Sequence, residues 1–275
     1  MAEITGIYAV SHTPVMTNMP DAPAPARREA AFRQFTRVGQ EIAAMQPDAL
    51  VLVSDDHLHN FFLDNLPPFC IGVARSYPSP VEGWLKIPRQ QLPGDAALAA
   101  HLLQSVMAAG FDPALSMELT LDHGMMTPLD LAGIAGAIPV VPILVNTVQP
   151  PMPAMRRCVA FGRALGQAIR GYMGAARVAV LATGGLSHDV GTPRMGQLDE
   201  AFDRGFLQQL EAGGLDAAAD FAEATVDTAG NGAEEVRNWL VAQGIAEGAP
   251  FETYHYDCIT DWYTGIGLGR WSMMA

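Results

Sequence analysis

The sequence predicts an α/β fold, with a central mixed, mostly parallel sheet flanked by helices and an active site at the strand carboxyl ends. Three observations predict it. Short, continuous apolar runs alternate with longer amphipathic stretches, as in strands joined by crossover helices. Hydrophobic residues make up 49% of the 275 residues and charged residues only 16%, which suffices for a packed core. No linker divides the chain, so we expect residues 1–275 to form a single catalytic domain.

The apolar runs predict the core strands. Each run is short and lies between turn residues, as expected of strands that are covered on both faces. In chain order the predicted strands are Ile4–Val10, Ala49–Ser54, Phe69–Ala74, Ile138–Val145 and Arg177–Thr183, followed by the alternating segment Phe251–Cys258. The run Ile138–Val145 contains two prolines, which cannot donate to a strand ladder, so we expect it at a sheet edge or with a bulge.

The amphipathic stretches predict the helices that cover this sheet. Their apolar residues recur with the spacing of one helical face. The predicted helices are Arg27–Met45, Asp95–Ala109, Met155–Met173, Leu198–Gly213 and Gly232–Gln243. Pro47 closes the first of them, and Gly110 supplies a C-cap for the second.

The charge and the apolar runs exclude two classes of partner. Against 29 acidic residues stand 16 basic ones, of which only Lys86 is a lysine, so the net charge is -13 and no basic cluster marks a nucleic-acid surface. No run reaches the roughly 18–20 apolar residues of a membrane span. The N-terminus lacks the features of a secretion signal, and three scattered cysteines fit a reducing compartment. We therefore expect a cytoplasmic protein with a small-molecule partner.

Three histidines occupy equivalent places in the predicted sheet. His12 follows the strand Ile4–Val10, His57 follows Ala49–Ser54, and His188 follows Arg177–Thr183. Open α/β sheets bind ligands beyond the carboxyl ends of their strands. The pattern therefore predicts one shared site, although histidines in strand-end loops can also be merely solvated.

A shared histidine site points to metal chemistry. Imidazole suits zinc, copper, iron and nickel, and two histidines with one carboxylate are typical of non-haem Fe(II) oxygenases. Spacing alone leaves the carboxylate open among Asp55, Asp56, Asp122, Asp189, Glu234 and Glu235. The absence of HExxH, GxSxG and the P-loop motif argues against zincins, α/β-hydrolases and P-loop NTPases.

Five stretches, in order along the chain, resemble the class III extradiol ring-cleavage dioxygenases. This family includes protocatechuate 4,5-dioxygenase catalytic subunits, gallate dioxygenases and 2,3-dihydroxyphenylpropionate 1,2-dioxygenases. The stretches are SHTP (Ser11–Pro14), DDHLHNFFLDNLPPFCIG (Asp55–Gly72), LDHGMMTPL (Leu121–Leu129), TGGLSHD (Thr183–Asp189) and EEVRNW (Glu234–Trp239). The second is the most specific and looks closest to the dihydroxyphenylpropionate branch.

The resemblance implies a role for each matching residue. His12 and His57 would bind Fe(II), and Glu235 would be the acidic ligand, because the family's glutamate lies four residues before a tryptophan. A shift of one residue would exchange it for Glu234. His188 resembles the family's catalytic base, and His123 resembles a further active-site histidine that helps in proton transfer. His59 is expected to be solvated or to face the substrate.

The resemblance also implies an activity. The protein would cleave a catechol-type ring outside its diol with dioxygen, in aromatic catabolism, giving a muconic semialdehyde-type product. Alternatives are a dihydroxypyridine or DOPA-like diol, another metal, or a non-catalytic metal-binding protein on the same scaffold. An anionic tail on the substrate could pair with Arg75, Arg194 or Arg237, although ordinary surface arginines would give the same pattern.

The resemblance bears on assembly as well. It implies a homo-oligomer and leaves open whether a small partner subunit is required. The C-terminal segment Asp261–Trp271 has the composition of a lid or a dimer contact.

Overall fold

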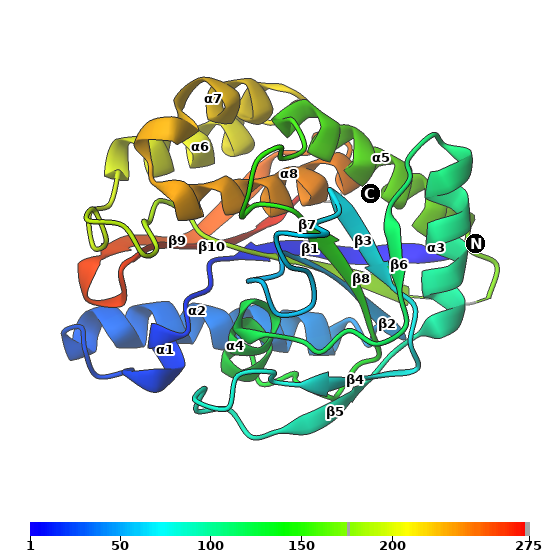
Figure 1. The fold of residues 1–275 in the computed structure, drawn as a ribbon, viewed down its shortest axis with the longest axis horizontal. Helices are drawn as coiled ribbons and strands as arrows, with labels where there is room; N and C mark the ends of the chain where they lie inside the picture. Colours follow the sequence, from blue (N-terminus) through cyan, green and yellow to red (C-terminus); the bar gives the residue numbers. More distant parts are fainter. Residues whose placement is uncertain (175–176, 273–275) are drawn as a thin grey trace.

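The centre of the fold is an eight-stranded sheet with the order β6-β3-β7-β2-β8-β1-β10-β9 (Figure 1). The structure is a computed structural model that describes residues 1–174 and 177–272. The strands are β1 (Glu3–Val10), β2 (Ala49–Ser54), β3 (Phe69–Gly72), β6 (Ala114–Ser116), β7 (Val140–Val145), β8 (Arg177–Thr183), β9 (Phe251–Ile259) and β10 (Thr264–Trp271).

The middle of the sheet is parallel and its flanks are mixed. Strands β7, β2, β8 and β1 run in the same direction. On one side β3 pairs antiparallel with β7 and parallel with β6, and on the other side β10 and β9 form an antiparallel pair. This confirms the predicted mixed, mostly parallel α/β sheet.

Helices cover both faces of the sheet. They are α1 (Val15–Asn18), α2 (Pro25–Ala44), α3 (Ala96–Ala108), α4 (His123–Leu131), α5 (Met155–Gly171), α6 (Glu200–Ala212), α7 (Ala217–Thr225) and α8 (Val236–Ile245). In Figure 1, α5 to α8 lie above the sheet, while α2, α4 and the hairpin of β4 (Ser76–Ser79) and β5 (Gln90–Pro93) lie below it. Among the described residues, no helix has the length and apolarity needed to cross a membrane.

The two covered faces explain the continuous apolar runs. Side chains alternate between the faces of a strand, so Val51 enters the core under α3 and α5, whereas Leu52 enters the core on the α2 side. With a packed layer on each face, every residue of β2 is buried.

The edge position expected for Ile138–Val145 is wrong. Strand β7 lies inside the sheet, between β3 and β2. Pro142 is in register with Leu52 of β2, while pairing with β3 stops at Ile71 opposite Ile143. Because Pro142 lies just beyond the last pair with β3, its missing N–H does not interrupt that ladder.

The C-terminal segment is part of the sheet and not a lid. Strand β10 pairs with β1 and with β9. Its glycines allow this position: a Cβ on Gly265 would lie 2.2 Å from the Asp203 carboxylate, and one on Gly269 would lie 2.2 Å from the Glu252 carbonyl oxygen. Residues 264–271 therefore form a strand inside the main sheet, which the composition of the segment alone did not indicate.

Candidate active site

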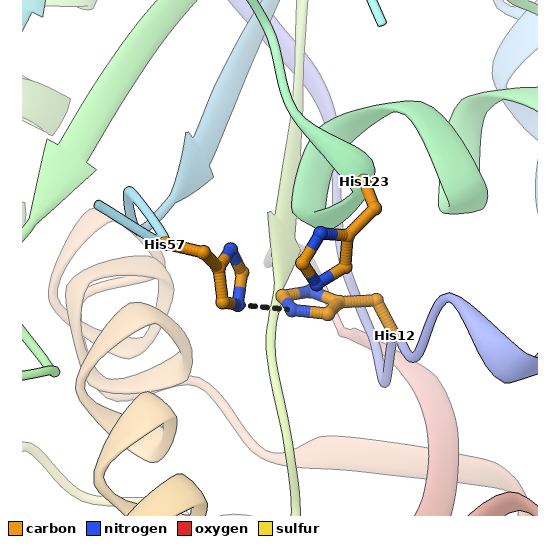
Figure 2. Close-up of side chains that lie close together, drawn as sticks. All are labelled: His12, His57 and His123. Atoms are coloured by element: carbon orange, nitrogen blue, oxygen red, sulfur yellow. Dashed lines mark hydrogen bonds between the residues drawn. The ribbon is translucent and has the colours of Figure 1, made fainter. Parts of the chain in front are cut away.

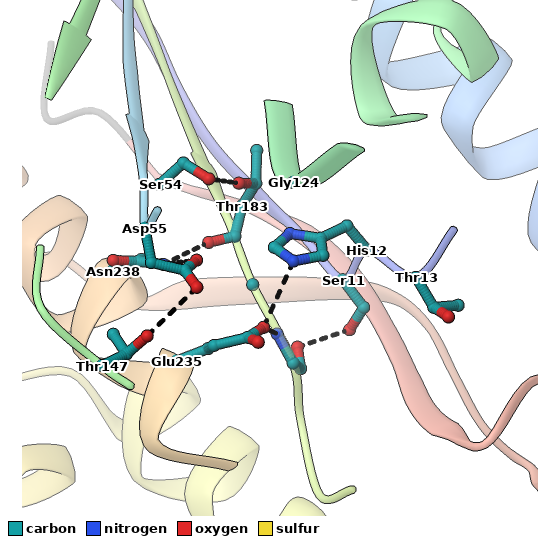
Figure 3. A network of polar contacts seen from close by, with 12 residues as sticks. Ser11, His12, Thr13, Ser54, Asp55, Gly124, Thr147, Thr183, Glu235 and Asn238 are labelled. Atoms are coloured by element: carbon teal, nitrogen blue, oxygen red, sulfur yellow. Dashed lines mark hydrogen bonds and ion pairs between the residues drawn. The ribbon is translucent and has the colours of Figure 1, made fainter. Parts of the chain in front are cut away.

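The carboxyl ends of β1, β2 and β8 bring the three strand-end histidines to one place, where Glu235 meets them. His12 Nε2 lies 3.4 Å from His57 Nε2 and 3.5 Å from Glu235 Oε2, and His57 Nε2 lies 3.6 Å from Glu235 Oε1 (Figures 2 and 3). We call these three side chains the donor cluster. His188 stands next to it, with Nε2 3.4 Å from Glu235 Oε1.

The donor cluster has the dimensions of a metal site. Its nitrogens lie 3.4 Å from each other and 3.5 and 3.6 Å from the nearest Glu235 oxygen, close to the roughly 3.0–3.6 Å that separates two atoms bound to one ion. Imidazole nitrogens and carboxylate oxygens bind transition metals at about 2.0–2.2 Å. Burial lowers the pKa of His12 to about 3, so this imidazole is neutral and presents a lone pair. The residues present therefore fit a divalent metal ion.

Asp122 fixes the orientation of His57. Its Oδ2 accepts hydrogen bonds from the His57 backbone N–H at 3.0 Å and from Nδ1–H at 2.9 Å, so Nε2 is the nitrogen that faces the cluster and would bind a metal. Its Oδ1 caps α4 by accepting from the Gly124 N–H at 2.9 Å. Gly124 lies directly against both rings, since a Cβ there would be 2.9 Å from His57 Cε1 and 3.1 Å from His12 Cε1.

The two adjacent glutamates face different partners. Glu235 ends the 3-10 helix Asn231–Glu235, which begins the helix expected at Gly232–Gln243, and it accepts a hydrogen bond from the Gly185 N–H. Burial alone would raise its pKa, but the neighbouring His188 imidazole holds that pKa well below the usual value, so the carboxylate stays ionised. Glu234 instead turns away and pairs with Arg237.

Asp55 is a second carboxylate at the site. Together with the donor cluster it forms a group of possible ligands, and its Oδ2 lies 3.3 Å from His57 Nε2. However, Oδ1 accepts from Asn238 Nδ2 at 3.0 Å and Oδ2 accepts from Thr147 Oγ1 at 3.1 Å (Figure 3). Burial raises the pKa of Asp55 to about 7. Both oxygens of Asp55 thus accept a hydrogen bond, whereas Glu235 accepts the Gly185 N–H at Oε2 and keeps Oε1 for the side of the histidines, so Glu235 fits a metal better.

His188 is held by the turn that follows β8. Its Nδ1–H donates to the Leu186 carbonyl oxygen at 2.9 Å, so Nε2 is the nitrogen that faces Glu235. Gly232 packs against this ring, and a Cβ there would come within 2.0 Å of Nε2. Gly230 has φ +102°, and a Cβ there would lie 2.1 Å from the His188 carbonyl oxygen. Both glycines thus permit the close approach of the Glu235 segment.

His123 lies at the start of α4 with its ring 4.0 Å from the His57 ring, between centroids (Figure 2). Its backbone N–H and its Nδ1–H both donate to Glu82 Oε1, at 3.0 and 2.6 Å, and His59 Nε2 lies 3.2 Å from the same oxygen. Sequence reasoning missed Glu82, because nothing in its local sequence marks it and its meaning depends on a contact across 41 residues.

A cavity of about 290 Å³ opens over the site, near the lower end of the ~300–1,000 Å³ typical of ligand pockets. The donor cluster, His123 and His188 form its floor. A neighbouring cavity of about 260 Å³ reaches Asp55, His57 and Glu235 from the other side. The site can thus hold a metal ion and one small ring beside two further imidazoles.

Known proteins share this sequence and fold. Residues 6–271 match the family described as "Catalytic LigB subunit of aromatic ring-opening dioxygenase". The chain is 30% identical to the 2,3-dihydroxyphenylpropionate/2,3-dihydroxicinnamic acid 1,2-dioxygenase of Paraburkholderia xenovorans, covering 95% of each protein. The enzyme of the same name from Cupriavidus necator is also 30% identical, over 94% of this chain and 96% of that enzyme.

A solved structure supports the fold alone. An uncharacterized protein of Escherichia coli K12 superimposes with a TM-score of 0.68 over 98% of this chain and 100% of that one, at 17% identity. The family match and the relatives together make this chain a ring-cleaving dioxygenase, an oxidoreductase of aromatic catabolism whose family depends on a metal. The chain belongs to the LigB family of aromatic ring-opening dioxygenases.

Proposed function

We propose that this enzyme uses Fe(II) and dioxygen to open a catechol-type ring outside its two hydroxyl groups, giving a muconic semialdehyde-type product. The observation that carries the proposal is the donor cluster, in which two imidazole nitrogens and one carboxylate face a cavity. Two histidines and one carboxylate with open positions are typical of non-haem Fe(II) oxygenases. The substrate proposed is a diol that is 2,3-dihydroxyphenylpropionate-like or protocatechuate- or gallate-like in the arrangement of its ring hydroxyl groups.

His12, His57 and Glu235 are the proposed metal ligands, with Glu234 outside the site. When bound, Fe(II) would supply the electron transfer from ring to dioxygen that neither the side chains nor a closed-shell ring provide. The remaining residues orient the substrate and move protons.

His188 is the proposed base. Its Nδ1–H is committed to the Leu186 carbonyl oxygen, so Nε2, on the Glu235 side of the cavity, is the nitrogen that would exchange a proton with the substrate. A diol hydroxyl bound beside the donor cluster would come within reach of this nitrogen. Deprotonation there makes the ring electron-rich before it meets dioxygen.

His123 is the proposed proton carrier for the later steps. Glu82 holds its Nδ1–H, so the opposite nitrogen is the one that exchanges protons with the bound substrate. This nitrogen must take up a proton before it can deliver one, and the proton removed from the diol is one source.

The experiment is reconstitution of anaerobically purified protein with Fe(II), Mn(II) or Zn(II). Oxygen uptake is followed over a panel of catechols together with the absorbance of the ring-opened product. We expect activity with Fe(II) and its loss in the presence of a chelator. Full activity in metal-free protein would exclude the proposed chemistry, whereas activity with Mn(II) alone would change only the metal.

The assembly stays a prediction. We expect a homo-oligomer, and the mass of the active species in solution would test this. Full activity of the purified chain on its own would show that a small partner subunit is not required.

A further inference from the structure

The outer part of the 290 Å³ cavity is apolar. Val15, Val190, Met195 and Tyr263 line it there, and we call them the apolar rim. Val190 is 60% exposed and Met195 is 51% exposed, so their apolar surfaces are not covered by the described part of the chain. A ring that binds on the donor cluster would extend its substituent over this surface.

No lysine or arginine is among the described residues that line this cavity. The same holds for the described lining of the neighbouring 260 Å³ cavity. Apart from Glu235, the acidic side chain among the described residues of the larger cavity's lining is the buried Asp189, which pairs with Arg194. A substrate carboxylate that lies against the rim would lose water where it covers apolar side chains and would gain no lysine or arginine partner, which is unfavourable.

None of the three arginines considered as partners of an anionic tail lines either cavity, and two of them already pair with an acidic side chain. Arg75 is exposed and lies outside both linings. Arg237 is buried, pairs with Glu234 and donates to the Pro153 carbonyl oxygen at 2.7 Å.

Arg194 lies nearest to the cavity. Its Nε is 3.3 Å from Asp189 Oδ2, and its Nη2 donates to the Thr228 carbonyl oxygen at 2.7 Å. Its charge is therefore matched within the protein. His59, the half-exposed imidazole in the lining, faces the Glu82 carboxylate in the same way.

We propose that the site prefers an uncharged catechol with an apolar substituent to one with an anionic side chain. This rests on the proposed function, because it places the diol on the donor cluster. It differs from what the names of the two relatives suggest, since 2,3-dihydroxyphenylpropionate carries a carboxylate.

The test compares 3-(2,3-dihydroxyphenyl)propionate with its methyl ester, which has the same diol and chain but no charge. We expect the kcat/KM for oxygen uptake to be at least about tenfold higher for the ester, equivalent to about 1.4 kcal/mol. Equal values, or a preference for the carboxylate, would overturn the proposal.

Variants locate the cause. Val190→Arg adds a cation at an exposed position of the rim, and it should shift the preference towards the carboxylate by about tenfold relative to Val190→Gln, its uncharged control. Arg194→Gln should leave the ratio of the two substrates unchanged. A selective loss of the carboxylate substrate in Arg194→Gln would mean that Arg194 does reach the ligand, and the proposal would fall.

Calorimetry without oxygen separates this proposal from the proposed function. Tighter binding of the ester to the Fe(II)-loaded protein supports the uncharged preference even if no ring is cleaved. If neither diol consumes oxygen but the ester binds better, the proposed reaction fails while the preference stands. If both diols are cleaved and the carboxylate binds better, the proposed reaction stands and the preference for an uncharged substrate fails.

Discussion

The donor cluster and the apolar rim face the same cavity but are built in different ways. The cluster residues follow parallel strands or end a 3-10 helix, and His12 and Glu235 are only 2% and 4% exposed. The rim residues Val190, Met195 and Tyr263 lie in connections between elements and are more than a third exposed. One region is held rigidly by the core, and the other is held by loops.

Because of this difference, we expect the donor cluster to determine the reaction and the apolar rim to determine which substrates bind. Hydrogen bonds orient two of the cluster side chains, from Asp122 behind His57 and from the Gly185 N–H at Glu235, and His12 packs against Gly124. The rim would meet the ligand through apolar surface and the Tyr263 side chain, and a loop can change these contacts without disturbing the metal site. We therefore expect large effects from changes in the cluster and small, substrate-dependent effects from changes in the rim.

The largest effect should come from the acidic ligand. Glu235→Ala should lose metal and all measurable ring cleavage, because the ionised carboxylate is the only anionic member of the donor cluster. Glu234→Ala is the matched control, since it removes a carboxylate one residue away that pairs with Arg237. Metal analysis and oxygen uptake measure both. Equal metal loss in the two variants would show that the ligand set is wrong.

The second effect tests the imidazole beside the cluster. His188→Ala should keep its metal, while kcat falls by about 10²–10⁴, the usual contribution of general-base catalysis. His12→Ala should instead lose the metal. If His188→Ala binds no metal, His188 is a ligand and the division between ligands and base must be redrawn.

That the three histidines lie together could be predicted from the sequence because it follows from the topology of the sheet. His12, His57 and His188 each follow a strand, and the carboxyl ends of parallel strands meet at one edge of a sheet. Glu235 came from the resemblance, and the structure turns it, unlike Glu234, towards the histidines.

The supporting residues could not be predicted because their roles depend on distant contacts. Glu82 matters through His123, and Asp55 is held by Thr147 and Asn238 from other elements. The prediction that β7 lies at a sheet edge failed for a related reason. Pro142 is visible in the sequence, but the residue at which pairing with β3 ends is not.

A third prediction concerns support beneath His188. Asp203 accepts hydrogen bonds from the Ser187 N–H at 2.7 Å, from Ser187 Oγ at 2.8 Å and from the Tyr256 hydroxyl at 2.8 Å. Burial raises its pKa from 3.8 to about 6, so the fold favours the protonated acid. The protonated Asp203 carboxyl group therefore makes its full contribution to the free energy of unfolding below pH 3.8, and this contribution is lost as pH rises through about 6.

Asp203→Asn should remove this pH dependence. Relative to the variant, the wild type should lose up to about 3 kcal/mol of unfolding free energy between pH 4 and 7. Urea unfolding at several pH values measures the difference. A difference that stays constant with pH would contradict the raised pKa.

A fourth, smaller effect should come from Glu82. Glu82→Ala frees the His123 ring and should lower kcat by about 10–100-fold, as loss of a partner behind an active-site histidine commonly does. Glu82→Gln keeps a carbonyl oxygen that can accept from both His123 N–H groups, so it should restore most of the rate. If both variants are equally slow and equally stable, the charge of Glu82 matters rather than its hold on the ring.

The smallest effect should come from the rim. Met195→Ala removes apolar surface that a substituent would cover, and each covered methylene is worth about 0.8 kcal/mol. We expect KM for an apolar catechol to rise by less than about tenfold, more than kcat falls, with metal content unchanged. Met107→Ala is the matched control, because Met107 is 52% exposed against 51% for Met195 but lies on α3, outside the cavity lining. For unsubstituted catechol, which does not reach the rim, the two variants should behave alike. A loss of metal or a hundredfold fall in kcat in Met195→Ala would mean that the rim also orders the donor cluster, and that chemistry and selectivity are not separate in this site.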